Sequence, residues 1–219
     1  IETAPIVIDG VDNIATDAVE ITLSNESGTA LKTETTGSTV LTGESLTGTI
    51  EDPASINLVT DGSKEVQTVI VNTASITNTV ITTAESTDGS TVAAAAIDIS
   101  AANIESVSIK TASTDQKSVV KFDQTTESVS DVRVELEGKG GDLTIETASV
   151  EGVAVKASGS EASEITFGSE VESVTNAQIE LAEAGGSVNL ESGTLSGSVI
   201  AIASAGDANN SVSIGENVA

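Results

Sequence analysis

The sequence predicts an all-β fold, namely a parallel β-helix (β-solenoid), and two observations carry this prediction. Apolar-polar-apolar triplets recur along the chain about every 23 residues. Apolar residues two positions apart lie on one face of a strand, whereas a helical stripe requires spacings of three and four. Short strands that recur at a fixed interval pair most simply with their equivalents in the next coil, in parallel and about 4.8 Å apart. We therefore expect one elongated domain with little or no helix.

The most regular part of the pattern runs from Ile97 to Ile214. Successive triplets begin there at steps of 23, 23, 22, 23 and 24 residues, which predicts six equivalent coils. The middle residue of each triplet is expected to point outward and the flanking residues inward, so that Phe122 and Phe167 belong to the core. The triplets are Ile97–Ile99, Val120–Phe122, Leu143–Ile145, Ile165–Phe167, Val188–Leu190 and Val212–Ile214.

A second triplet and a single aliphatic residue occur in each of these coils. The single aliphatic lies between the two triplets and predicts a third side or a corner. We expect the second triplets to stack on one another as the first triplets do. The second triplets are Val107–Ile109, Val132–Val134, Val153–Val155, Ile179–Leu181 and Ile200–Ile202, and the single aliphatics are Ile104, Val129, Val150, Val174 and Leu195.

The remaining segments are less regular. Residues 1–17 do not fit the repeat and are expected to form an N-terminal cap or a strand donated to another subunit. Residues 18–89 are expected to form irregular early coils of roughly 20–27 residues, and residues 90–219 the regular solenoid with an open C-terminal coil. The strands expected in the early coils are Val19–Leu23, Thr39–Leu41, Ile56–Val59, Val69–Val71 and Ile76–Ile81, separated by turn signals such as Asp61-Gly62 and Asp88-Gly89.

The composition limits the classes of partner that the chain is expected to bind. Thirty-four acidic residues against eight basic ones give a net charge of −26, which disfavours nucleic acid and anionic membrane surfaces. No apolar run approaches the roughly 18–20 residues that span a bilayer, so membrane insertion is not expected. Cysteine is absent, which excludes a disulfide framework and thiolate metal sites. Methionine is also absent, so we expect a processed chain or a piece of a longer one.

The residue types argue against an enzyme. Without His or Cys the common nucleophile and general-base arrangements are missing. The single arginine, Arg133, lies at the outward middle of a triplet and is expected to be a surface charge near Glu135 and Glu137. Sugar-stacking Trp and Tyr are absent, and the outward residues of the first triplets form no regular threonine array of the kind that binds ice.

Calcium is the candidate ligand that the sequence leaves open. Asp123 and Glu146 follow equivalent triplets in adjacent coils, so their carboxylates are expected about one strand spacing apart, where a hard cation would relieve their repulsion. Asp9 and Asp12 belong to a second oxygen-rich cluster near the N-terminus. The alternative is that both clusters are solvated acidic corners, since neither an EF-hand loop nor a glycine-aspartate nonapeptide occurs.

The ends of the predicted stack suggest assembly. Residues 211–219 begin a further coil that contains Val212 and Ile214, and no amphipathic helix or basic plug is apparent to cover it. Either the sequence is part of a longer protein, or the open coil receives the N-terminus of the next subunit, through Ile6, Val7 and Ile8. Such a head-to-tail homopolymer does not close on itself.

At this point the chain resembles a class of proteins. Its acidic, Cys-free repeats rich in Ser, Thr, Ala, Val and Gly are similar to surface-layer proteins and repeat-rich adhesins of bacteria and archaea, many of which are β-solenoids. The resemblance implies a structural protein at the cell surface or outside the cell. We therefore expect a self-assembling filament, sheath or surface layer, with the stalk of a large adhesin as the alternative and a polysaccharide-active enzyme as a distant third possibility.

Overall fold

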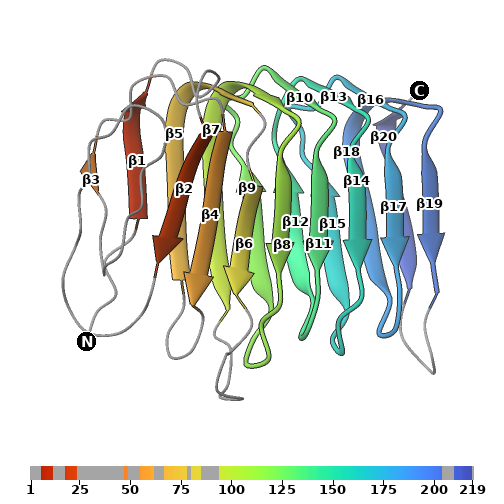
Figure 1. Cartoon of the computed structure of the whole chain (residues 1–219). Coiled ribbons are helices and arrows are strands. Elements are labelled where there is room, and N and C mark those ends of the chain that lie inside the picture. Colours follow the sequence, from red (N-terminus) through yellow and green to blue (C-terminus); the bar gives the residue numbers. More distant parts are fainter. Residues whose placement is uncertain are drawn as a thin grey trace.

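The computed structural model describes residues 6–11, 18–23, 47–48, 55–61, 67–77, 80–84, 94–203 and 210–218, with side chains at 80–81, 94–191, 193–203 and 210–215. These residues form twenty strands and no helix. Every strand pairing among them is parallel, and the strands make one 12-stranded and one 8-stranded sheet. The predicted parallel β-solenoid is confirmed (Figure 1). Within the same residues no helix is long and apolar enough to cross a membrane.

Each regular coil has three sides. The first and second sides belong to the 12-stranded sheet, which bends between them, and the third side belongs to the 8-stranded sheet. In β5 (Gln67–Thr77), β7 (Ala95–Glu105) and β18 (Gly186–Ser196), one 11-residue strand runs through both the first and second sides. The other coils use separate strands, which are β9 (Ser118–Phe122), β10 (Ser128–Ser130), β11 (Arg133–Leu136), β12 (Gly141–Ile145), β13 (Ser149–Glu151), β14 (Ala154–Ala157), β15 (Ser163–Phe167), β16 (Ser173–Thr175) and β17 (Gln178–Leu181).

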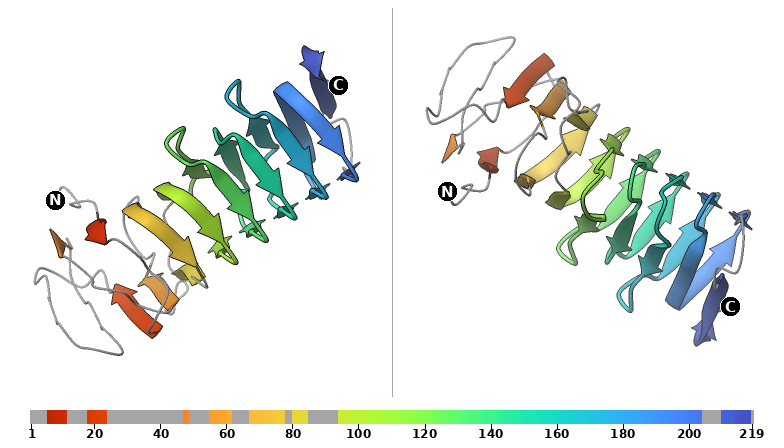
Figure 2. Two further views of the ribbon diagram at one scale, coloured as in Figure 1. Left: turned by 90° about the horizontal axis from the view of Figure 1, so that it is seen from above. Right: turned by 90° about the horizontal axis from the view of Figure 1, so that it is seen from below.

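The remaining strands extend these sides toward the two ends of the stack. The 8-stranded sheet runs in the order β19-β17-β14-β11-β8-β6-β4-β2, from the C-terminal to the N-terminal end. Figure 2 shows the coils arranged as a rod, with the N-terminal and C-terminal strands at opposite ends. The remaining bounds are β1 (Ile6–Val11), β2 (Ala18–Leu23), β3 (Thr47–Gly48), β4 (Ser55–Asp61), β6 (Val80–Ala84), β8 (Ser108–Thr111), β19 (Val199–Ile202) and β20 (Ser211–Val218).

The register of the first and second sides agrees with the sequence pattern. All six first triplets stack in the predicted alignment, from Ile97 opposite Val120 to Val188 opposite Val212. The single aliphatics also form one column, which begins with Ile104 opposite Val129. Phe122 and Phe167 are 0% and 2% exposed and lie in one continuous apolar core, as predicted.

On the third side, the predicted alignment of the second triplets is wrong for the last two coils. Val155 pairs with Ile179 and Ile179 with Ile200, so the last two triplets lie two residues further along the strand than predicted. A shift of two residues leaves every side chain on the same face of the sheet, so apolar alternation alone does not distinguish the two registers. The inward position level with Val153 is taken instead by Ala177 and Ser198, which do not continue the triplet pattern.

The early coils follow the sequence pattern more loosely. The predicted strands at Val19–Leu23, Ile56–Val59 and Val69–Val71 fall within β2, β4 and β5. The stretch Ile76–Ile81 is not a single strand, because Ile76 lies in β5 opposite Ile104 and Ile81 lies in β6 opposite Ile109. The predicted strand at Thr39–Leu41 lies outside the described residues.

Candidate functional site

The C-terminal end of the stack is the candidate site, because there the apolar core is only partly covered. Strand β20 pairs with the first side of β18, placing Val212 opposite Val188 and Ile214 opposite Leu190. On the third side, β19 is the last strand of the 8-stranded sheet, and within the described part of the chain it pairs with β17 alone. The described residues thus close the last coil on its first side and leave the third side with an edge strand.

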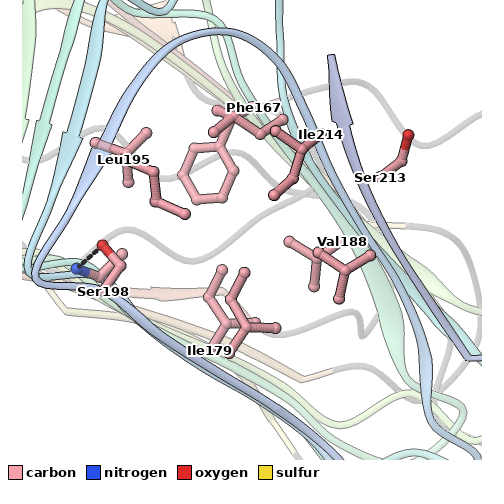
Figure 3. A pocket seen from close by; sticks show the side chains of 12 residues that line it. Phe167, Ile179, Val188, Leu195, Ser198, Ser213 and Ile214 are labelled. Atoms are coloured by element: carbon pink, nitrogen blue, oxygen red, sulfur yellow. Dashed lines mark hydrogen bonds between the residues drawn. The ribbon is translucent and has the colours of Figure 1, made fainter. Parts of the chain in front are cut away.

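Because of this arrangement, the apolar side chains of β20 are partly exposed to solvent. Val212 is 48% exposed and Ile214 56%, whereas Leu143 in the same column as Val212 is 0% exposed. Behind them lies a small apolar recess that is partly open to solvent. Figure 3 shows Ile214, Phe167 and Leu195 together at one side of this recess, with Val188 and Ile179 at the other.

The recess is lined almost entirely by apolar side chains. Among the twelve residues that line it, only Ser198 and Ser213 are polar, and none is charged. The Ser198 hydroxyl accepts a hydrogen bond from the Ala177 N–H at 3.0 Å and donates one to the Ser196 carbonyl at 3.2 Å. Both hydrogen bonds of this hydroxyl are therefore made with backbone groups near the corner where Ser198 lies. Apolar side chains beside an unpaired strand edge favour the binding and burial of another apolar strand.

The other predicted assembly residues lie at the opposite end of the rod. Ile6, Val7 and Ile8 belong to β1, which pairs with β5 of the same chain so that Ile6 lies opposite Val69. Val7 and Ile8 also pair with β3. The structure therefore places this segment in the N-terminal coil of its own chain, and it does not bring β1 together with Val212 and Ile214.

The structure places Asp123 and Glu146 at equivalent corners of adjacent coils, with a lysine beside them. Lys121 Nζ lies 3.2 Å from Glu146 Oε2, and the hydrogen bond to this carboxylate is the main cause that raises the pKa of Lys121. Partial burial is the main cause that raises the pKa of Asp98; the charge of Lys121 opposes this shift, and the charges of Asp123 and Glu146 add smaller upward contributions. The cluster therefore contains its own cation.

No group of three or more acidic, His or Cys side chains in the described part of the chain is arranged to hold a metal ion. Of the N-terminal candidates, Asp9 lies in β1 at a position where only the backbone is described, and Asp12 lies outside the described residues. Calcium binding by Asp123, Glu146, Asp9 and Asp12 stays a prediction.

Most of the lysine side chains that the structure describes link one coil to the next. Lys110, Lys117 and Lys139 pair with acidic residues of the following coil, namely Glu137 at 3.2 Å, Asp142 at 2.6 Å and Glu161 at 2.9 Å. These pairs are partly exposed, so each contributes on the order of 0–1 kcal/mol. They connect neighbouring coils through side chains, in addition to the backbone hydrogen bonds of the sheets.

The third side adds a charge pattern that the sequence analysis missed. Glu135 lies between Lys110 and Lys156, and Lys156 in turn lies between Glu135 and Glu180, so the outward column alternates in sign. Lys110, Glu135 and Lys156 are level in the predicted register as well, and only the corrected register brings Glu180 level with Lys156. Arg133, which is 61% exposed, pairs with Glu135 on the same strand, as predicted for a surface residue.

Comparison of the chain with protein-family models, with curated proteins and with solved structures gives no match. The class that can be stated is therefore that of the fold, a parallel β-solenoid with coils of about 23 residues.

Proposed function

We propose that this chain is a structural protein that assembles end to end into an extracellular filament, sheath or surface layer. The observation that carries the proposal is the open C-terminal end, where Val212 and Ile214 are about half exposed beside an apolar recess. Burial of aliphatic surface contributes roughly 25 cal/mol for each Å² removed from water. A further coil stacked on this end would gain that burial together with a row of strand hydrogen bonds.

The polarity of the strands supports a head-to-tail contact between copies. Because all described pairings are parallel, β19 and β2 are edge strands of one sheet that point the same way at opposite ends of the rod. A second copy in the same orientation can continue this sheet without reversing direction. A contact of this kind joins two different surfaces, so it propagates into an open polymer.

The proposed extracellular setting rests on the sequence. The net charge of −26 suits a protein surrounded by cations or salty water. The resemblance in composition and coil length to surface-layer proteins points the same way. On this proposal the chain is not an enzyme and its partner is a second copy of itself, with no role for nucleic acid or membrane insertion.

A stalk segment of a large cell-surface adhesin is the second candidate. The observation that favours it is the rod shape itself, in which coil follows coil along one axis (Figure 2). A stalk separates a binding domain from the cell and needs only stiffness. The same open end would then be covered by more of one polypeptide.

Substitution at the open end tests the proposal. Ile214→Glu places a charge in the apolar recess, and we expect it to abolish polymers seen by negative-stain microscopy and sedimentation. The matched control is Val119→Glu, because Val119 is 46% exposed on a first side within the stack. The control should polymerise as the unsubstituted protein does.

Deletion of residues 1–17 provides a second arm of the same experiment. We expect it to abolish assembly while the strand signal in circular dichroism is retained. Normal filaments from the shortened chain, or from Ile214→Glu, would contradict the proposal. Unsubstituted protein that stays monomeric at high concentration would favour the stalk.

A further inference from the structure

The outward face of the third side differs in charge from the rest of the rod. Figure 1 shows its strands side by side along the rod and pointing the same way. From β8 to β19 the outward residues of these strands include three basic and two acidic ones, a formal charge of +1 in a chain of net charge −26. The outward residues are Ser108 and Lys110, Arg133 and Glu135, Ala154 and Lys156, Gln178 and Glu180, and Val199 and Ala201.

The strands of the other two sides carry an excess of acidic residues. On the second side, the charged outward residues of the strands from β7 to β18 are Glu105 and Glu151, and both are acidic. On the first side, from β7 to β15, one outward lysine stands against three carboxylates, and these residues are Lys121, Asp98, Asp142 and Glu164. The third side is therefore the lateral face at which a second copy of this acidic rod meets the least repulsion.

The charges of the third side alternate in sign along the rod. Strand pairing places one charged residue of each coil in a single outward column, which runs Lys110, Glu135, Lys156 and Glu180. A column of this order is complementary to its own reverse. If two copies face each other with their rods antiparallel, Lys110 lies opposite Glu180 of the second copy, and Glu135 lies opposite Lys156 of the second copy.

The neighbouring outward column fits the same arrangement. It runs Val80, Ser108, Arg133, Ala154, Gln178 and Val199. A two-fold axis parallel to the strands, between β11 and β14, places Val80 opposite Val199 of the second copy. These two valines are 42% and 61% exposed, so their contact would remove apolar surface from water at both ends of the face. The same axis places Arg133 opposite Ala154, so no like charges meet.

The charged side chains of this column are accessible to a partner. Lys156 and Glu180 are exposed, and neither forms an ion pair with another residue in the described part of the chain. Glu135 already pairs with Arg133 and is partly exposed. A carboxylate has about four acceptor sites, so Glu135 can bind Arg133 and a lysine of a second copy together.

We propose that the third side is a lateral contact between two antiparallel copies of this chain. The partner is a second copy because the face matches its own reverse in charge and in the position of its exposed valines. A two-fold contact of this kind closes at two copies, and its axis repeats every ion pair. The lateral contact does not depend on the open end of the stack. Together with the proposed end-to-end contact, it would join filaments side by side in pairs.

Charge reversal followed by mixing of variants tests the lateral contact. All chains are full length and carry Ile214→Glu, which blocks the end-to-end contact. In Lys156→Glu two carboxylates meet across the contact, and in Glu135→Lys two ammonium groups meet. We expect the parent chain to dimerise at low ionic strength in sedimentation equilibrium, and each variant alone to have a Kd roughly tenfold or more higher. An equal mixture of the two variants should dimerise as the parent does, because every carboxylate then faces an ammonium group.

The control is Glu151→Lys, which makes the same charge change on the second side and should leave dimerisation unchanged. A parent chain that stays monomeric, variants that each dimerise as the parent does, or a mixture that does not regain the dimer would each overturn the lateral contact. Recovery on mixing also shows that the variants are folded. If the chain without Ile214→Glu forms lateral dimers and no polymers, the lateral contact stands and only end-to-end assembly is contradicted.

Discussion

At the scale of single residues, the positive φ at each corner between the second and third sides limits which residue types can lie there. Ser106, Asp131 and Asn176 adopt the left-handed conformation although they are not glycine. Asn and Asp tolerate this region better than other residues with a Cβ. Gly152 and Gly197 have the same conformation and in addition lie against the Asx side chain of the preceding coil.

Gly152→Ala is expected to lower the free energy of unfolding by about 1–2 kcal/mol. The alanine would have to adopt a φ near +64°, and its Cβ would lie 2.7 Å from the Asp131 carboxylate. The carboxylate can swing away because Asp131 is exposed, so the backbone conformation accounts for most of the loss. Urea denaturation followed by circular dichroism measures the change.

Gly168→Ala is the control for this substitution. Gly168 has no positive φ, and the atom nearest to a Cβ there is the Glu146 Cγ at 3.1 Å, in a flexible side chain. Its effect should stay within about 0.5 kcal/mol. An equal loss in the two variants would show that corner conformation is not what Gly152 supplies.

At the scale of strands, the sequence predicts the first and second sides well. A triplet such as Val120–Phe122 has apolar residues two apart, and its repeat interval is nearly constant, so face and register are both determined. On the third side the intervals alternate, and alternation of apolar residues is insensitive to a shift of two. The Ile179–Leu181 triplet was therefore placed wrongly by pattern alone.

The candidate site was predictable in part. Val212 and Ile214 complete the triplet pattern, so the sequence shows that another coil begins there. The contact between Gly197 and Asn176 could not be predicted, because it depends on which residues of neighbouring coils are level at the corner between the second and third sides. Asp131 and Asn176, like Gly152 and Gly197, are 45 residues apart in the sequence, but only the structure shows that all four are corner residues with a positive φ.

Excision of coils is expected to succeed in pairs. Removing residues 141–185 joins Gly140 to Gly186, so a coil with seven positions from Phe122 to Val129 is followed by one with five positions from Leu190 to Leu195. Removing residues 141–162 joins Gly140 to Ser163 and stacks two seven-position coils, with Phe122 against Phe167 and Asp131 against Asn176. Because overpacking costs about 1–3 kcal/mol at each site, the smaller deletion should melt at the lower temperature.

Thermal unfolding followed by circular dichroism distinguishes the two deletions. Cooperative melting of the 45-residue deletion, with a broad or early transition in the 22-residue deletion, is the expected result. If both deletions melt alike, the alternation of seven-position and five-position coils does not govern stacking.

At the scale of the whole molecule, charge opposes the proposed association of copies. The net charge of −26 is spread along the rod, so each copy repels the next. Ion pairs between coils, such as Lys117 with Asp142, offset part of this repulsion only inside the chain.

Polymerisation is therefore expected to accelerate with ionic strength. The screening length falls from about 30 Å at 0.01 M salt to about 10 Å at 0.1 M, which weakens repulsion between copies more than it weakens apolar burial at Ile214. Light scattering across a sodium chloride series measures the rate. Slower assembly at higher salt would indicate that charge attraction, and not burial of the open end, drives the contact.

The parallel ladders of the rod also have a mechanical consequence. Hydrogen bonds between coils run along the rod axis, while the covalent chain winds around it. A pull applied at one end of the chain therefore loads only the last coil and peels it away before the next one is strained. Each peeled coil releases about 80 Å of extended chain, so a rod of this kind lengthens under tension instead of snapping.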